Sequence, residues 1–265
     1  MNRIDEIFTA AREEGRKLLM PFVCAGSPAP GMLGPLLRAT QDGGAGIVEV
    51  GFPFSDPIAD GPAIASAMHT ALGQGCTPER ILDEVARTRG DLSIGVVAMV
   101  SVSIVEAMGG ARAFCERTLE SGFDGLIVPD CPLEESDALI DATRRTGQSL
   151  SLLISPTTPP ERAAQIADAC SGFVYMLARS GITGARDDAP EIGPRVAELR
   201  TGSDLPIACG FGIATPEHVR TVVEHADAAI VGSALVSRLR DAHERGADAI
   251  EVGRAFVREL GAGLT

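Results

Sequence analysis

Aromatic and positively charged residues are both scarce in this sequence. The 265 residues include nine Phe, one Tyr and no Trp, so we expect an aliphatic core. Single-stranded nucleic acid, which stacks on aromatic side chains, is disfavoured as a ligand. Lys and Arg number 23 against 36 Asp and Glu, a net charge of −13 that repels phosphate backbones and anionic membranes. An anionic substrate would therefore have to be held by local backbone N–H groups.

Several familiar signals are absent as well. The six cysteines show no C-x₂₋₄-C spacing, and the four histidines lack the spacing of metal ligands. No G-x-S-x-G, H-E-x-x-H or G-x-x-x-x-G-K-[ST] motif occurs. Residues 1–17 predict an amphipathic helix rather than a signal peptide, and prolines and glycines interrupt the uncharged run 18–37. We therefore expect a cytoplasmic protein with reduced thiols, no membrane span and no bound metal.

Short apolar runs alternate regularly with segments of helical period. The runs are almost continuously hydrophobic, which is typical of parallel strands covered by helices. Thr-Pro pairs at 77–78 and 215–216 predict helix starts, and residues 107–119 and 249–260 each place apolar side chains on one helical face. The alternation predicts an α/β fold, a single-domain (β/α)8 TIM barrel over residues 1–265. An open doubly wound sheet is the alternative, disfavoured because no G-x-G-x-x-G follows the first run. The eight expected strands are 20–24, 46–51, 94–99, 125–129, 151–155, 172–177, 206–210 and 228–232.

Carboxylates mark one candidate site. Glu49 lies within the apolar run 46–51, where a charge is costly unless it is paired or lies at a functional opening. Barrel enzymes carry their catalytic groups at the C-terminal ends of the strands, so Glu49 is a candidate general acid–base with a raised pKa. Pairing with an Arg or a helix end is the structural alternative. Asp56 and Asp60 follow in a loop rich in Pro and Gly, and they are either turn formers or, if the loop folds back, partners of Glu49.

Three glycine-bearing segments mark a candidate anion site. SGITGAR (180–186), CGFGI (209–213) and VGSAL (231–235) follow the last three expected strands. Glycines let backbone N–H groups approach an anion, and a helix N-terminus adds a favourable dipole. The residues alone therefore predict a phosphosugar-type substrate worked on by carboxylates.

These segments, read together, resemble the tryptophan synthase α-subunit family. The resemblance rests on IVEVGFPFSDPIADGP, VYMLARSGITG, CGFGIATPEHV and DAAIVGSALV, and PFVCAGSP and PDCPLEES extend it over nearly the whole chain. It implies a (β/α)8 barrel and a lyase of L-tryptophan biosynthesis. The implied reaction is the retro-aldol cleavage of indole-3-glycerol phosphate to indole and D-glyceraldehyde 3-phosphate.

The resemblance also implies residue roles. Glu49 matches the general acid–base, and Asp60 matches the carboxylate that holds the indole N–H and stabilises positive charge during cleavage. Loops Pro53–Asp60 and Ser180–Arg186 would close over the substrate and signal to a partner. Pro53, Asp56 and Arg179 are the residues implied for this communication, and Asp56 pairs with Thr183 between the loops. The substrate-binding residues implied are Phe22, Tyr175, Thr183, Gly184, Phe211, Gly212, Gly232 and Ser233.

The implied partner is a β subunit in an αββα heterotetramer. Pyridoxal phosphate would belong to that subunit, and no cofactor is implied for this chain. The family usually shows Tyr-x-Asn and then Pro after the third strand, whereas this chain has Val100–Ser103 there, and Cys24 and Ser27 replace the common Thr and Asp. Docking of the β subunit is the implication that the altered loop puts in question.

Three alternatives to the biosynthetic α subunit follow. The chain could be a stand-alone indole-releasing lyase, or a weakly active α-like subunit that mainly activates a β partner. It could also be a different phosphosugar-binding barrel with another aldol or isomerase reaction.

Overall fold

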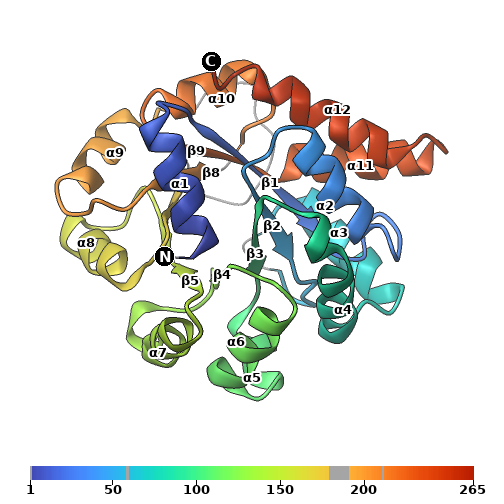
Figure 1. The fold of residues 1–265 in the computed structure, drawn as a ribbon, viewed down its shortest axis with the longest axis horizontal. Helices are drawn as coiled ribbons and strands as arrows, with labels where there is room; N and C mark the ends of the chain where they lie inside the picture. The colour runs from blue at the N-terminus through green and yellow to red at the C-terminus, as the bar shows by residue number, and fades with distance from the viewer. Residues whose placement is uncertain (1, 58–59, 179–190, 211) are drawn as a thin grey trace.

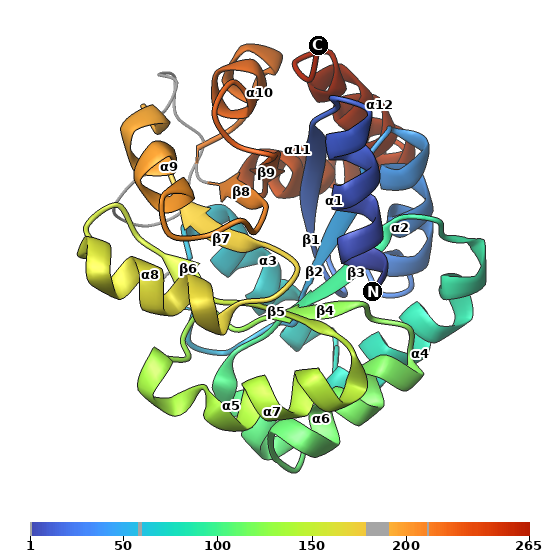
Figure 2. The same ribbon diagram turned by 60° about the vertical axis from the view of Figure 1, so that its left-hand side comes forward.

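The computed structural model describes residues 2–57, 60–178, 191–210 and 212–265. Within them the strands are all parallel and follow one another around a ring in the order β5-β4-β3-β2-β1-β9-β8-β7-β6 (Figures 1 and 2). This order confirms the barrel and rules out the doubly wound sheet. That the chain 1–265 is one domain stays a prediction. The strands are β1 (Leu18–Cys24), β2 (Ile47–Gly51), β3 (Gly95–Met99), β4 (Gly125–Ile127), β5 (Ser149–Ser151), β6 (Leu153–Ile154), β7 (Val174–Leu177), β8 (Ile207–Gly210) and β9 (Ala228–Val231).

The barrel closes through a strand whose position was predicted wrongly. A run over 151–155 was expected, but the chain forms two short strands with a break at Leu152, of which β5 pairs with β4 and β6 with β7. Side chains in the segment before β7 accept backbone hydrogen bonds here: Leu150 N–H donates to Ser171 Oγ at 3.0 Å, and Leu152 N–H donates to Cys170 Sγ at 3.2 Å. The two short strands thus occupy the eighth position of the ring.

Strand alternation divides the core into two layers. In β2, Val48 and Val50 point outward into the layer between strands and helices, whereas Ile47 points into the barrel with Val97 of β3 and Tyr175 of β7. Because side chains alternate along a strand, Glu49 shares the inward face of Ile47.

Helices surround the ring. Thr77 and Thr215 accept hydrogen bonds from backbone N–H groups of the helices that follow them, which confirms both predicted caps. Within the described residues no helix has the length and apolar character needed to cross a membrane. The outer elements are α2 (Leu33–Asp42), α3 (Pro62–Gly73), α4 (Pro78–Thr88), η1 (Arg89–Asp91), α5 (Val102–Ala107), α6 (Gly110–Glu120), η2 (Leu133–Glu135), α7 (Asp137–Thr146), α8 (Pro160–Ala169), α9 (Gly193–Arg200), α10 (Pro216–Val223), α11 (Ser233–Glu244) and α12 (Ala249–Gly261).

The expected apolar face over 107–119 belongs to two helices, not one. The chain breaks between α5 and α6, where Gly109 and Gly110 adopt φ values of 102° and 84°, conformations that favour glycine. Phe114 and Cys115 are fully buried as expected, but Leu119 is 45% exposed.

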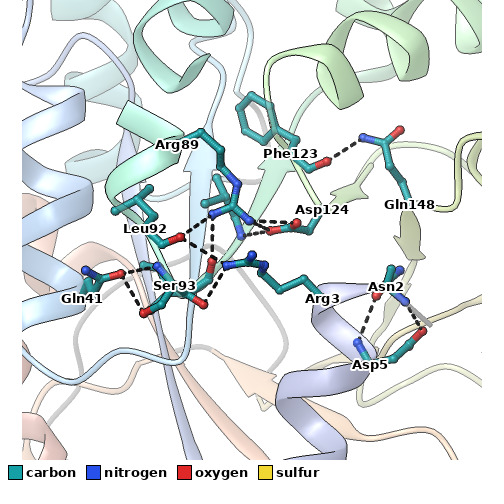
Figure 3. A network of polar contacts seen from close by, with 12 residues as sticks. Asn2, Arg3, Asp5, Gln41, Arg89, Leu92, Ser93, Phe123, Asp124 and Gln148 are labelled. Atoms are coloured by element: carbon teal, nitrogen blue, oxygen red, sulfur yellow. Dashed lines mark hydrogen bonds and ion pairs between the residues drawn. The ribbon is translucent and has the colours of Figure 1, made fainter. Parts of the chain in front are cut away.

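One end of the barrel is closed by α1 (Arg3–Glu13), which lies across it in Figure 1. Ile4 and Phe8 of α1 pack among the interior side chains, and Arg3 donates to the carbonyls of Leu92 and Ser93 (Figure 3). Beside these contacts Arg89 holds Asp124 with two hydrogen bonds of 3.0 and 2.9 Å. Because α1 blocks the end at which the strands begin, a ligand has access only at their C-terminal ends.

Candidate active site

A cavity of about 540 Å³ opens at the C-terminal ends of the strands. Its size lies within the ~300–1,000 Å³ range typical of small-molecule sites. Its described lining residues include no Lys, Arg or His. Of the predicted site residues, the cavity brings together Phe22, Glu49, Asp56, Asp60, Tyr175, Gly212, Gly232 and Ser233.

Glu49 lies on β2 and is fully buried. Neither carboxyl oxygen has a hydrogen-bond partner among the described residues, so the pairing with Arg or a helix end is not formed there. Burial raises the pKa of the Glu49 carboxyl well above its ordinary value. A carboxyl whose pKa is raised in this way keeps its proton to a higher pH than a free glutamic acid and can donate that proton to a bound molecule.

Asp60 lines the same cavity as Glu49. The loop that carries Asp60 therefore folds back toward the barrel, as a second carboxylate in the site requires. The Asp60 backbone N–H donates to Pro57 O at 3.1 Å in a turn of the β2–α3 loop. Burial raises the pKa of the Asp60 carboxyl to about 6, so this group is mostly ionised at neutral pH. Two carboxyls with pKa values set apart by their surroundings can play an acid role and a charge-stabilising role in one reaction.

Tyr175 and Phe22 form part of the wall around these carboxyls. Burial, together with the neighbouring Glu49 and Asp60 carboxyls, raises the pKa of the Tyr175 phenol well above its ordinary value. Phe22 on β1 is paired in register with Glu49 on β2. The absence of a side chain at Gly51 makes room for the Phe22 ring: an added Cβ would lie 2.3 Å from Phe22 Cζ.

Replacing Gly51 with Ala should therefore damage the cavity wall. The methyl group forces the Phe22 ring to move, and such overpacking costs about 1–3 kcal/mol. We expect a lower melting temperature and a reduced kcat/KM for the retro-aldol cleavage that the sequence resemblance implies. Gly73→Ala is the matched control, because its added Cβ meets no atom within 4 Å and should leave both quantities near those of the wild type. An unchanged melting temperature and kcat/KM in Gly51→Ala would contradict this account of the wall.

The anion cradle lies at the N-terminus of α11. Gly232 is its N-cap residue, and it has no side chain to accept from the first N–H groups of the helix. Gly232, Ser233 and Ala234 all line the cavity, and Gly212 joins them from the turn after β8 with φ 79°. The backbone N–H groups at a helix N-terminus and the positive end of the helix dipole favour binding of a phosphate, as predicted for this segment.

Some predicted residues lie elsewhere. Asp56 is exposed at the rim of the cavity, and Pro53 is buried but is not part of the lining. Arg179, Thr183, Gly184 and Phe211 lie outside the described residues, as does the whole segment SGITGAR.

Other lining residues were missed from the sequence. Met99 and Leu177 end β3 and β7, Leu153 begins β6, and all three line the cavity. Each lies two residues beyond an inward-facing residue of the same continuous strand path, so the alternation could have identified them. They were missed because only polar residues were sought at the strand ends.

The altered loop after β3 also contributes. Ser101 Oγ donates to Asp130 Oδ2 at 2.6 Å, and Val102 N–H donates to Asp130 Oδ1 at 2.9 Å. Asp130 thereby fixes the start of α5 at the rim of the cavity. Asp130 was not singled out from the sequence, where it read only as part of PDCPLEES.

A parallel barrel whose cavity is lined by two carboxyls of raised pKa and by a helix N-terminus is typical of a (β/α)8-barrel enzyme for a phosphorylated substrate. Comparison with known proteins makes this specific. The family model described as tryptophan synthase alpha chain matches residues 8–264. Proteins named tryptophan synthase alpha chain from Laribacter hongkongensis and Halorhodospira halophila are 41% and 43% identical, each over 98% of this chain and over 98% and 95% of the relative. The crystal structure of tryptophan synthase subunit alpha from Legionella pneumophila superimposes with a TM-score of 0.90 at 31% identity, covering 100% of this chain and 98% of that one.

This chain belongs to the tryptophan synthase alpha chain family. The resemblance drawn from the sequence is thus confirmed, and with it the barrel.

Proposed function

We propose that Glu49 and Asp60 carry out the family's α reaction in this chain. That reaction, which family membership assigns to the chain as a lyase of tryptophan biosynthesis, is the retro-aldol cleavage of indole-3-glycerol phosphate to indole and D-glyceraldehyde 3-phosphate. The observation that carries the residue assignment is that Glu49, whose pKa burial raises well above its ordinary value, and Asp60, whose pKa is about 6, line one cavity with the N-terminus of α11.

The proposed steps balance in protons and electrons. Protonated Glu49 gives its proton to C3 of the indole ring, and the ring nitrogen takes up the positive charge. Ionised Asp60 accepts the hydrogen bond of the ring N–H and stabilises that charge. The Glu49 carboxylate then removes the proton of the hydroxyl on the side-chain carbon attached to C3. The bond between C3 and that carbon breaks, its electron pair returns to the ring, and the carbon becomes the aldehyde of glyceraldehyde 3-phosphate. Glu49 ends the cycle protonated, as it began.

The remaining assignments concern binding. The α11 N-terminus with Gly212, Gly232 and Ser233 would hold the phosphate, aided by Gly184, while Phe22, Tyr175 and Phe211 would enclose the ring. Thr183 would pair with Asp56 between the loops over the substrate, and Pro53 and Arg179 belong to the same loops. No cofactor or metal is needed for the steps above, and pyridoxal phosphate would be held by the partner.

We further propose that the chain works in the cytoplasm with a tryptophan synthase β subunit, as an αββα heterotetramer. Members of this family partner the β chain in general. The loop fixed by Asp130 stands at the rim of the cavity, where a docked partner would receive indole.

The deciding experiment measures indole release from indole-3-glycerol phosphate by the purified chain, with and without its cognate β subunit. We expect release that rises when the β subunit is added, together with a complex in analytical ultracentrifugation. Fast release that ignores the β subunit would instead identify a stand-alone lyase. Stimulation of the β reaction without cleavage would identify an activating subunit, and no effect of either kind would point to another phosphosugar substrate.

The pH dependence tests the role of Asp60 separately. Since the pKa of Asp60 is about 6 and the ionised form is the active one, kcat/KM should fall as the pH drops below about 6. The substrate phosphate also titrates near pH 6, so Asp60→Asn provides the control. In that variant the fall due to residue 60 should disappear, at a much lower rate, and only the phosphate titration should remain. An unchanged acid limb in Asp60→Asn would assign the limb to the substrate.

A further inference from the structure

The cavity extends away from the phosphate cradle to the opposite side of the barrel. The cradle belongs to β8, β9 and the start of α11, and in the ring of strands β3 lies four positions from β8 in either direction. A substrate held by its phosphate at the cradle and by its reacting carbon at Glu49 on β2 directs its most distant atoms toward β3. For the proposed substrate these atoms are those of the benzene ring.

Met99, the last residue of β3, lines the cavity on this side. Met99 lies two residues after the inward-facing Val97, and it packs against both the barrel interior and the cluster that contains Phe22. It is only partly buried. A methionine side chain is unbranched and rotates about three bonds, so it can adapt its shape to ligands of different outline.

Beyond Met99 the loop after β3 contributes Val100, Ser101 and Ser103 to the described lining, all of them smaller than methionine. Ser101 Oγ donates to Asp130 Oδ2 at 2.6 Å. The second bond to that carboxylate, from Val102 N–H, fixes the turn that carries these residues. The cavity thus continues past Met99 to the rim.

We infer that Met99 sets the size of ring system that the site accepts, and that the chain also cleaves indole-3-glycerol phosphates with a small apolar substituent on the benzene ring. This inference rests on the proposed function, since it uses the same reaction and the same anchors. The bond broken and the proton transfers are those already given, and only the aromatic product differs.

The test compares indole-3-glycerol phosphate with its 5-methyl and 6-methyl derivatives. The readout is the ratio of kcat/KM for each methylated substrate to that for the parent. Fitting or excluding one methyl group changes kcat/KM by about 10–200-fold. We expect a wild-type ratio within about tenfold of unity for at least one derivative, a ratio at least about tenfold lower in Met99→Phe, and a higher ratio in Met99→Ala. Met108→Ala replaces a partly buried methionine at the end of α5, outside the cavity lining, and should keep the wild-type ratio.

The outcomes separate the inference from the function on which it rests. Cleavage of the parent compound by the wild type, with ratios that do not change at Met99 or with both derivatives rejected more than about 200-fold, overturns the inference alone. No cleavage of the parent overturns the proposed function. Thermal unfolding of each variant shows whether a changed kcat/KM ratio comes from misfolding. If Met99→Phe misfolds, the ratio in Met99→Ala, which adds no volume, decides whether Met99 sets the accepted ring size.

Discussion

Glu49→Gln is expected to abolish indole release while leaving the substrate bound. The amide has nearly the shape of the carboxyl but cannot transfer a proton to C3 or remove one from the hydroxyl. A positioned general acid–base contributes about 10²–10⁴-fold to a rate, and here one group performs both transfers, so kcat should fall by at least that factor. Glu49 is fully buried without a hydrogen-bond partner among the described residues, and burial raises the pKa of its carboxyl, so a neutral amide should not destabilise the fold.

Calorimetric titration of the inactive variant with indole-3-glycerol phosphate measures binding directly. We expect a dissociation constant within a few-fold of the value that wild type shows for a non-cleavable analogue lacking both hydroxyls. Glu49→Asp serves as the companion variant: it retains a carboxyl, displaced by one methylene, and should keep a small measurable rate. Turnover by Glu49→Gln equal to that of the wild type would remove Glu49 from the mechanism.

Features of the fold could be predicted where the local sequence encodes them directly, and were misplaced where it does not. Most of the strands were predictable because burial on both faces requires continuous apolar runs, as in Ile47–Gly51. The closing strand was placed wrongly because β5 begins with Ser149 and ends with Ser151, and polar residues that face the barrel interior interrupt an apolar run. The break between α5 and α6 was readable in Gly109-Gly110, but the apolar spacing around it was taken as one helix.

The site divides in the same way. Glu49 could be predicted because its signal, a carboxyl inside an apolar strand, is visible in the local sequence. The return of Asp60 depends on how a whole loop packs against the barrel, so it needed the structure. Met99 was readable from the alternation along its strand, two residues after Val97, but was missed because only polar residues were sought.

The second large effect concerns the phosphate cradle. Gly232→Asp should weaken substrate binding by about two to three orders of magnitude, because the new carboxylate stands where the phosphate binds. Two unit charges 4 Å apart repel by about 4 kcal/mol at an effective dielectric constant of 20, and tenfold in affinity corresponds to about 1.4 kcal/mol. The measurement is KM for indole-3-glycerol phosphate, together with the inhibition constant of glycerol 3-phosphate, which contains the phosphate but not the ring.

Gly232→Ala separates charge from bulk at the same position. An added Cβ would lie 3.6 Å from Ile64 Cδ1 and 3.7 Å from Phe22 Cβ, ordinary contact distances, so the fold should accept the methyl group. We expect a much smaller loss of affinity in Gly232→Ala than in Gly232→Asp. The loss in Gly232→Asp should also shrink at high salt to the extent that the cradle is open to solvent. Unchanged inhibition by glycerol 3-phosphate in Gly232→Asp would place the phosphate elsewhere. In that case the backbone groups of the cradle would not explain how a chain of net charge −13 binds an anion. The described lining offers no cationic side chain in their place.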